Sequence, residues 1–530
     1  MKKSPRQNNP PDRNSARSAF VGLLIAASLL FGLGLGGTDL WAPDEPRYGA
    51  IAEEMRSGRH GAEGWVLLHL NDAPYTQKPP LYFWFAAALG APLGRVTEVA
   101  ARLPSVLAGI FCVGLTARIA RRLGAHPRAA LLAAALLATS FRFIFTARRA
   151  QLDVLLTAFE LIAVALFVAA EFRASDDGQP DAPPTLQIAG IHAAMGAAAL
   201  VKGPVGWLPL LIMAAYLGWQ GRIRCFRRYS PAWALLLSFG PLLIWISGAI
   251  ALAPPGFAEI AVGENVFGRF FSGTSHVRPF YYFLFQLPLD FLPWAFFLPF
   301  AIPVLWNRAR TSPAEPSAHA TSAARFLACW ALVPLIFFTL SAGKRGVYLL
   351  PIFPALSMIC LYAAPGYAAS GIWPLAEPAR NWARRSFVCV AVIALIELAG
   401  FAFGLPLLQA EKSPRPIAEG IARQAGPLET VGVYGLTPIE GGLAYYGGLR
   451  TESLRSEPQL ATFLDGGEDG SRTSDAGRLV LLRARHFEAL APRFGLRRIA
   501  AFRKGRRQLI LAEPRPNSQG DHISTLEPPS

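Results

Sequence analysis

Residues 39–82 read DLWAPDEPRYGAIAEEMRSGRHGAEGWVLLHLNDAPYTQKPPLY. This stretch follows the first long apolar segment, and it places acids and cations between segments that are hydrophobic enough to cross a membrane. Charged side chains at the edge of a bilayer are costly unless they are solvated or paired, so they mark a functional site by default. The stretch therefore predicts a polar site at a membrane surface, on a chain whose fold is set by the apolar segments around it.

The centre of this stretch has the pattern of a short turn that opens a helix. Pro46 suits the first helical turn, and Asp44 just before it suits a cap. The apolar residues that follow recur at i, i+3, i+4 and i+7, which predicts one face of an amphipathic helix lying on the membrane surface. These residues are Tyr48, Ile51, Ala52 and Met55. A solvated loop with a capped helix is the alternative interpretation.

The composition is that of a polytopic membrane protein. Hydrophobic residues make up 52% of the chain and charged residues 16%, against roughly 25% charged residues in soluble domains. The net charge of +16 comes mostly from Lys and Arg in short loops and the tail, as the positive-inside rule produces, so it requires no nucleic-acid partner. The five cysteines are scattered without a CxxC motif, which indicates small buried hydrophobes rather than a disulfide framework.

Apolar runs predict an all-α polytopic fold with about eleven to thirteen transmembrane helices. The runs are 18–37, 103–117, 129–145, 154–170, 186–200, 207–219, 232–253, 281–306, 326–340, 348–364 and 387–408. With the basic N-terminus inside, nearly every Arg cluster falls on the inner side, as the positive-inside rule requires. The short run 80–93 is expected to be tilted, partly inserted or interfacial.

We expect four parts along the chain, with a composition change at residue 411. They are a cytoplasmic tail (1–17), a transmembrane domain (18–410) with a first periplasmic loop (38–102), a small periplasmic α/β domain (411–516) and a disordered tail (517–530). In the α/β domain, strands are predicted at 429–434, 479–482 and 508–512 and helices at 417–424 and 486–490. The odd crossing count places this domain outside.

The outer side collects mixed acids and cations, whereas the inner side collects only the Arg clusters that topology explains. The outer set is Asp44, Glu45, Arg47, Lys78, Arg149, Asp153, Lys202, Glu264, Asn265, Arg269, His276, Arg278, Lys344 and Arg345. Cations of this kind hold phosphate oxygens by charge-assisted hydrogen bonds. A carboxylate among them could deprotonate a hydroxyl or stabilise positive charge at a sugar carbon.

Several of these residues also have a purely structural interpretation. Asp153 follows Arg148 and Arg149 at a spacing that suits an ion pair at a helix end. Lys202 could extend from a helix end toward the membrane surface. His276 could be an ordinary loop histidine. The sequence alone leaves these alternatives open.

Seven motifs in order resemble those of bacterial integral-membrane glycosyltransferases with the GT-C fold. The nearest resemblance is to the lipid A 4-amino-4-deoxy-L-arabinose transferases and their protein O-mannosyltransferase relatives. The motifs are DEPRY (44–48), LN…PY…QKPPLYFW (70–84), EVAARLPS (98–105), AQLD (150–153), VKGP (201–204), ENVFGRF…H…PFYY (264–282) and LSAGKRGVYLLPIFPAL (340–356). The resemblance covers about the first 400 residues, and it is specific to the superfamily rather than to one sugar.

The resemblance implies an inverting enzyme that moves a sugar from a polyprenyl (undecaprenyl)-phosphate donor to an extracytoplasmic acceptor, such as lipid A, another envelope glycan or a protein. It makes the transmembrane domain the catalytic one, in the bacterial inner membrane, with its active site on the periplasmic side. Asp44 and Asp153 carry over as catalytic residues. The donor-phosphate cations carry over to Arg47, Lys78, Lys202, Arg269 and Lys344. Further candidates for the substrate pocket are Glu45, Tyr48, Glu264, His276 and Tyr348.

The chain departs from the family at one position that concerns a metal. Aminoarabinose transferases have Glu before the lysine of the KP motif, and that Glu, with a loop histidine, is associated with a divalent metal. Here the position is Gln77. A neutral amide is a poorer ligand for zinc, so no metal is carried over to this chain.

Two other classes of protein remain as alternatives. A transporter or flippase of lipid-linked sugars predicts charges along a path near the bilayer midplane, whereas this sequence places them at one edge. A membrane-anchored sensor with a ligand-binding C-terminal domain leaves the charges at the membrane edge unexplained.

Overall fold

The structure is a computed structural model that divides into two compact units. It describes residues 13–173, 183–272, 277–311, 318–363, 377–425, 430–436, 439–465, 478–505 and 507–515. The first unit is helical and takes in Met1–Thr38, Ile51–His69 and Pro74–Pro406. The second unit contains Leu407–Ser530, and it also takes in Asp39–Ala50 and Leu70–Ala73 from the first loop. Hydropathy gives no sign of this grouping, because the two loop segments are far from the C-terminus in sequence.

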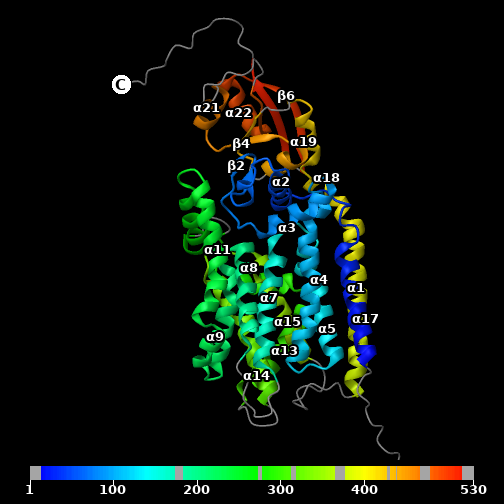
Figure 1. Cartoon of the computed structure of the whole chain (residues 1–530). Helices are drawn as coiled ribbons and strands as arrows, with labels where there is room; N and C mark the ends of the chain where they lie inside the picture. Colours follow the sequence, from blue (N-terminus) through cyan, green and yellow to red (C-terminus); the bar gives the residue numbers. More distant parts are fainter. Residues whose placement is uncertain are drawn as a thin grey trace, which may run out of the picture. The chain divides into compact units, whose positions relative to one another are not determined.

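The helical unit is built from long apolar helices joined by short turns. Its elements are α1 (Arg13–Gly32), the end of α2 (Asp44–Arg56), η1 (Glu63–Trp65), α3 (Leu81–Gly90), η2 (Ala91–Leu93), α4 (Glu98–Arg122), α5 (Pro127–Ala138), α6 (Phe141–Ala147), α7 (Leu152–Glu171), α8 (Thr185–Lys202), η3 (Pro204–Trp207), α9 (Leu208–Trp219), η4 (Ile223–Cys225), α10 (Phe226–Tyr229), α11 (Ala232–Leu252), η5 (Glu259–Ser272), α12 (Tyr282–Asp290), η6 (Trp294–Phe297), α13 (Leu298–Arg310), α14 (Ala318–Leu340), η7 (Gly346–Ile352), α15 (Phe353–Ile359), η8 (Cys360–Ala363), α17 (Glu377–Ala399) and η9 (Gly400–Gly404). Helix α7 packs against α4 and α8, and α8 packs against α11 (Figure 1).

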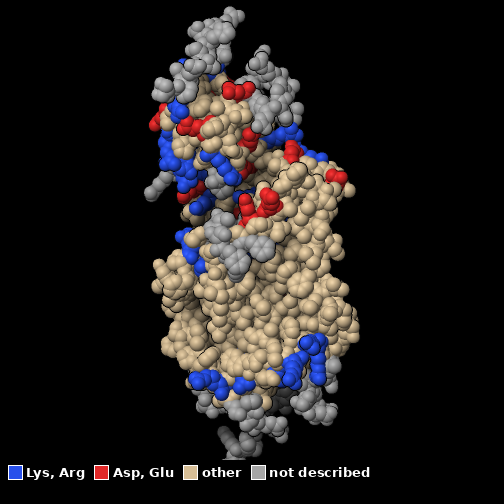
Figure 2. All heavy atoms as spheres, turned by 90° about the vertical axis from the view of Figure 1, so that its left-hand side faces the viewer, with Lys and Arg blue, Asp and Glu red and all other residues tan. Residues whose placement is uncertain are grey.

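Six described helices are long and apolar enough to cross a membrane, and two bent pairs raise this number to eight. Three shorter apolar helices, Ala16–Gly32, Leu81–Leu93 and Pro204–Trp219, lie where the sequence predicts apolar runs. On one face of the helical unit, a broad belt carries few charged residues, and Lys and Arg gather at one end of it (Figure 2). This is the surface that a polytopic membrane protein presents to lipid and to the membrane boundary.

Two predicted spans are not single straight helices. The run 129–145 forms α5 and α6, bent by 67°, and the run 281–306 forms α12 followed by η6 and α13, bent by 112°. In the first, the side-chain hydroxyls of Thr139 and Ser140 donate hydrogen bonds to the carbonyls of Ala135 and Leu137, respectively, at the point where the helix is interrupted. In the second, prolines at 288 and 293 remove backbone donors at the break.

Two buried arginines fasten the C-terminal end of α1. The Arg102 guanidinium, from α4, donates to the carbonyls of Leu35 (2.6 Å) and Thr38 (2.8 Å). The Arg148 guanidinium, between α6 and α7, donates to the carbonyls of Leu30 (2.5 Å) and Leu33 (2.6 Å). Leu30 belongs to the last turn of α1, and Leu33, Leu35 and Thr38 follow it, so these bonds fix both the end of the helix and the segment just after it.

The second unit contains a five-stranded mixed sheet, and its C-terminal part forms a small α/β domain. Its strands are β3 (Thr430–Tyr434), β4 (Arg450–Leu454), β5 (Val480–Arg483), β6 (Leu496–Lys504) and β7 (Arg507–Pro514), and its helices are α18 (Leu405–Lys412), α19 (Arg415–Ala422), α20 (Glu440–Gly447), α21 (Glu457–Asp465) and α22 (Ala484–Phe494). The strand order is β4-β3-β5-β7-β6, with β3 parallel to β4 and β5 and with β7 antiparallel to its neighbours. A two-stranded hairpin, β1 (His69–Leu70) and β2 (Ala73–Pro74), lies in the first loop.

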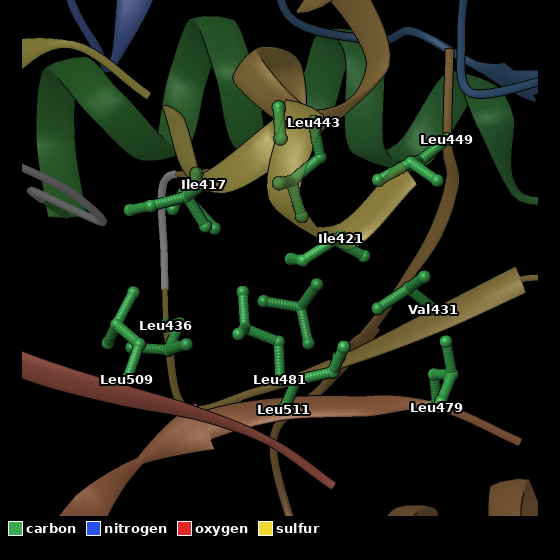
Figure 3. Packing of buried hydrophobic residues seen from close by; sticks show 13 residues of the cluster. Ile417, Ile421, Val431, Leu436, Leu443, Leu449, Leu479, Leu481, Leu509 and Leu511 are labelled. Atoms are coloured by element: carbon green, nitrogen blue, oxygen red, sulfur yellow. The ribbon is translucent and has the colours of Figure 1, made fainter. Parts of the chain in front are cut away.

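Alternating side chains of the central strands fill two separate cores. Leu481 and Leu511 point to one core with helices α19 and α20, as Figure 3 shows, whereas Val480 and Ile510 point to the other with α21 and α22. This two-residue period is the signature of a sheet covered on both faces. The predicted strands and helices of this domain are all present, and the structure adds β4, β6, α20 and α21.

Substitution Arg102→Met should lower the free energy of unfolding by about 2–4 kcal/mol, because it removes the donor of the Leu35 and Thr38 carbonyls in the segment after α1. Thermal unfolding of the purified protein in detergent would measure this. Arg118→Met is the matched control, since Arg118 is an exposed residue of the same helix. Equal effects of the two substitutions would contradict the assigned role of Arg102.

Candidate functional site

In the second unit, the candidate residues of the DEPRY motif form the first turn of α2. The helix begins at Asp44 itself, one residue earlier than a capping role for Asp44 requires. Asp44 and Glu45 are buried, and both acids lie at the helix end where the macrodipole favours negative charge. The Glu45 carboxylate accepts a hydrogen bond from the Trp41 backbone N–H (3.0 Å), and Arg47 Nη1 lies 3.9 Å from Asp44 Oδ1.

The predicted apolar face of this helix is confirmed as buried. Tyr48, Ile51, Ala52 and Met55 are between 0% and 6% exposed. Residues on the other sides of the helix, among them Glu45, Ala50 and Glu54, are buried as well, so the helix is enclosed by protein and is not the surface helix with one buried face that the pattern predicts.

In the helical unit, the structure brings together two residues that are far apart in sequence. Asp153 is in the first turn of α7, and Lys202 is the last residue of α8. The Lys202 ammonium donates to Asp153 Oδ1, and each side chain is only 12% exposed. Gly203, with φ of +81°, ends α8 directly after the lysine, in a conformation that glycine adopts without strain. The Asp153 carboxylate and the Lys202 ammonium thus meet where α7 begins and α8 ends.

Two further side chains complete this group, which we call the Asp153 cluster: Asp153, Lys202, Tyr348 and Glu160. The Lys202 ammonium lies 4.4 Å from the centre of the Tyr348 ring, a cation–π distance. Glu160 lies two turns along α7 from Asp153 and is 4% exposed. Its Oε1 accepts no hydrogen bond from any residue that the structure describes. The cluster therefore offers an unoccupied acceptor to a further hydrogen-bond donor.

Lys344 lies in a short, firmly held loop between α14 and η7. Its ammonium donates to the carbonyls of Ser341 and Arg278, the latter at 3.3 Å. Gly343 pairs with Val277 as an antiparallel bridge, and burial lowers the pKa of Lys344 below its usual range. The two hydrogen bonds and the lowered pKa both indicate that the Lys344 ammonium is held away from solvent.

The remaining candidates are only partly placed by the structure. Lys78 is half-buried just before α3, and Glu264 is an exposed residue of η5. Arg269 lies in η5 without a described side chain, and His276 lies outside the described residues. Their predicted roles stay predictions.

The structure places the residue at which this chain departs from the family's metal ligands. Gln77 is exposed and offers an amide oxygen where the family has a carboxylate, and an amide is a weak zinc ligand. Independence from a metal stays a prediction.

Sequence reasoning missed a second buried ion pair in the helical unit. Arg142 of α6 donates to Asp290 Oδ1 of α12 at 2.6 and 2.8 Å, and Gln286 donates to the same oxygen at 2.7 Å. A Cβ at Gly346 would collide with Asp290 Oδ2, so the chain needs glycine there. The one available signal was an acid within the apolar run 281–306, which is costly in a membrane segment unless paired.

Comparison with known proteins confirms the resemblance that the motifs indicate. A family model described as dolichyl-phosphate-mannose-protein mannosyltransferase matches residues 19–259. An undecaprenyl phosphate-alpha-4-amino-4-deoxy-L-arabinose arabinosyl transferase of Pseudomonas fluorescens is 33% identical over 341 residues, which are 64% of this chain and 54% of that protein. A protein of the same name from Pseudomonas aeruginosa is 32% identical over 362 residues, 66% of this chain and 60% of that one. The chain thus spans between half and two thirds of the length of these relatives.

Solved structures show the fold. ArnT from Cupriavidus metallidurans, bound to undecaprenyl phosphate, matches with a TM-score of 0.72 and 22% identity, over 94% of this chain and 98% of that one. The archaeal oligosaccharyltransferase AglB from Archaeoglobus fulgidus matches with a TM-score of 0.54 and 13% identity, over 88% of this chain and 69% of that one. The chain is therefore a multi-pass membrane protein with the fold of these GT-C proteins and a small C-terminal α/β domain.

The Lys202–Asp153 pair should behave as a coupled unit. Lys202→Met or Asp153→Asn alone should lower the free energy of unfolding by roughly 3–5 kcal/mol, because each leaves an unpaired buried group, and the double substitution should cost less than the sum. Thermal unfolding of the four proteins in detergent would measure the coupling.

The exposed pair Arg493–Glu457 is the matched control, with side chains 62% and 41% exposed. Its removal should change the free energy of unfolding by less than about 1 kcal/mol. Additive effects of Lys202→Met and Asp153→Asn would contradict the coupling.

Proposed function

We propose that the protein is an inverting glycosyltransferase that moves a sugar from undecaprenyl-phosphate-sugar to lipid A. The observation that carries this proposal is the buried Lys202–Asp153 pair, because it lies within residues 19–259, the part that the mannosyltransferase model matches. The names of the arabinosyl transferase relatives, and the ArnT structure with undecaprenyl phosphate, support the donor, whereas lipid A as the acceptor rests on the resemblance of the sequence motifs. Another envelope glycan or a protein is the alternative acceptor.

The reaction breaks the bond between the sugar anomeric carbon and the donor phosphate. The acceptor oxygen attacks the opposite face of that carbon, so its configuration inverts, and undecaprenyl phosphate leaves with the bonding electron pair. A phosphate of lipid A is already an anionic nucleophile and needs no base, whereas a hydroxyl acceptor must lose a proton. Asp44 serves a hydroxyl acceptor as general base. With a phosphate acceptor, it orients the sugar and stabilises positive charge at the anomeric carbon.

The cations of the site stabilise the leaving phosphate. Lys202 and Lys344 are buried or nearly so, which strengthens their interaction with an anion compared with lysines in water. Asp153 accepts a hydrogen bond from the Lys202 ammonium and so holds it in place before the donor binds. By the resemblance of the motifs, Arg47, Lys78 and Arg269 stay predicted phosphate contacts, and Glu45, Tyr48, Glu264, His276 and Tyr348 stay predicted substrate-pocket residues.

The site and the C-terminal domain face the periplasm in this proposal, with the N-terminus in the cytoplasm of a bacterial inner membrane. The basic clusters at one end of the helical unit support this orientation, since such clusters stay on the cytoplasmic side. The lipid-linked donor and lipid A would then both reach the site along the outer leaflet.

Asp44→Asn should abolish transfer, by at least about 100-fold, while the protein still inserts in the membrane. The measurement is mass spectrometry of lipid A from a deletion strain complemented with the parent or the variant. Loss of a lipid A species one sugar heavier, with donor accumulating, is the expected outcome. Full transfer by Asp44→Asn would contradict the role of Asp44, and unchanged lipid A in the deletion strain would move the acceptor elsewhere.

Transfer should not depend on a divalent metal. Incubation of the purified protein with EDTA should leave the rate of sugar transfer in liposomes unchanged, because Gln77 replaces the carboxylate ligand. Gln77→Glu is the companion variant, and it should acquire sensitivity to EDTA. Loss of parental activity in EDTA, restored by zinc, would contradict this prediction.

A further inference from the structure

We propose that the C-terminal α/β domain positions residues 39–50, the segment of the first loop that carries Asp44. This inference rests on the proposed function, because it takes Asp44 as the group that acts on the substrate. Residues 39–50 belong to the same compact unit as residues 407–530. The residues of the domain that hold the segment are called the cradle: Gln409, Ser413, Arg415, Gly441, Tyr445 and Tyr446.

The cradle first binds Asp39, five residues before Asp44. The Ser413 hydroxyl donates to Asp39 Oδ2 (2.7 Å), and Arg415 Nη1 lies 3.4 Å from Asp39 Oδ1. Arg415 is itself fixed, because its Nε donates to Glu419 (2.7 Å) and its guanidinium lies 5.5 Å from the centre of the Tyr446 ring. These two partners of the Asp39 carboxylate hold the first residue of the segment against the domain.

The next two residues are held by side chains of α18 and α20. The Leu40 backbone N–H donates to the Tyr446 hydroxyl (2.6 Å), and the Trp41 indole N–H donates to Gln409 Oε1 (2.9 Å). The backbone N–H of Trp41 donates to Glu45, which neighbours Asp44 in the first turn of α2. These hydrogen bonds connect the domain to the first turn of α2, which carries the proposed catalytic carboxylate, Asp44.

On the far side of Asp44, the backbones of α2 and α20 approach so closely that glycine is required. A Cβ at Gly441 would lie 2.5 Å from the Arg47 Cα and 2.7 Å from its backbone nitrogen. A Cβ at Gly49 would lie 2.8 Å from the Tyr445 ring. Both contacts fall below the distances that real Cβ atoms show. Asp44 is therefore held from residues 39–41 on one side and from residues 47–49 on the other.

The hairpin turn of the first loop is fastened to the same domain. Asn71 Nδ2 donates to Thr451 Oγ1 (2.6 Å), and Arg450 Nε lies 2.9 Å from Asp72 Oδ2. Asn71 and Asp72 have φ angles of +59° and +65°, the left-handed conformation that Asn and Asp favour in a two-residue hairpin turn. The domain thus binds the first loop at two separate places, as a positioning role requires.

The test compares the parent protein with Gly441→Val, which pushes against the Arg47 backbone, and Tyr446→Phe, which removes the acceptor for Leu40. Both should lower kcat, by about 10- to 100-fold for Gly441→Val and by less for Tyr446→Phe, while KM for the lipid-linked donor changes less than twofold. Hydrogen–deuterium exchange of residues 39–50 should rise in both variants. Tyr446→Phe removes one oxygen, so it keeps the test valid if Gly441→Val does not fold.

A pair of charge variants supplies the matched control. Arg450→Ala removes the ion pair that fastens the hairpin turn, and Arg497→Ala removes the Arg497–Glu513 pair between β6 and β7, which touches no part of the first loop among the described contacts. Exchange of residues 70–73 should rise only in Arg450→Ala. Activity and exchange at residues 39–50 should be unchanged in Arg497→Ala.

The outcomes separate this inference from the proposed function. Normal kcat in Gly441→Val and Tyr446→Phe, despite faster exchange of residues 39–50, would overturn the positioning role. Unchanged exchange of that segment in both folded variants would overturn the cradle itself. Absence of sugar transfer by the parent protein would instead refute the proposed function, and exchange would still decide whether the domain holds the segment.

Discussion

The helical unit depends on the binding of the end of α1 by two buried guanidinium groups. In an apolar environment, the last carbonyls of a helix have neither an intrahelical donor nor water, so another part of the chain must supply donors. Arg148 does so for the Leu30 carbonyl, and Arg102 donates to the carbonyls of Leu35 and Thr38 in the segment just after the helix. Arginine suits this task because it stays charged and has five donors in a fixed plane. Arg148 also lies 4.5 Å from the centre of the Phe401 ring. One end of the first helix, the α6–α7 junction and a late element of the unit are therefore joined, and the chain leaves α1 toward residue 39 from a fixed point.

The same electrostatics explain why the Asp153 cluster forms at helix ends. The N-terminal end of a helix carries a partial positive charge and the C-terminal end a partial negative charge. Asp153 and Lys202 each occupy the end that favours their own charge, on two helices that pack together, so the pair is stabilised by both macrodipoles as well as by mutual attraction. A buried ion pair adds little net stability, because desolvation offsets its attraction. Its presence is therefore not explained by stability alone, and it agrees with the proposed role of Lys202 in phosphate binding.

The sequence predicted those features that depend on local pattern. The apolar runs, the buried face of α2 and the strands at 430–434 and 480–483 all follow from periodicity and hydropathy. It missed strand β4, whose RTESL sequence is largely polar because the strand lies at the sheet edge. It did not join Lys202 to Asp153, since 49 residues separate them, and ion pairs over such distances leave no periodic signal. The two bent spans were missed because hydropathy does not register the direction of a helix.

The glycines of α20 show how closely the C-terminal domain packs against the first-loop segment. Glycine in a helix interior costs about 1 kcal/mol relative to alanine, yet this eight-residue helix contains Gly441 and Gly442 side by side. A Cβ at Gly442 would lie 2.5 Å from the Pro414 side chain, and one at Gly441 would meet the Arg47 backbone at the same distance. The first glycine is thus required by the loop segment, and the second by the start of α19. Packing within the C-terminal domain explains only Gly442. Gly441 is explained by the contact with residues 39–50, so the sequence of the domain is adapted to this segment of the first loop.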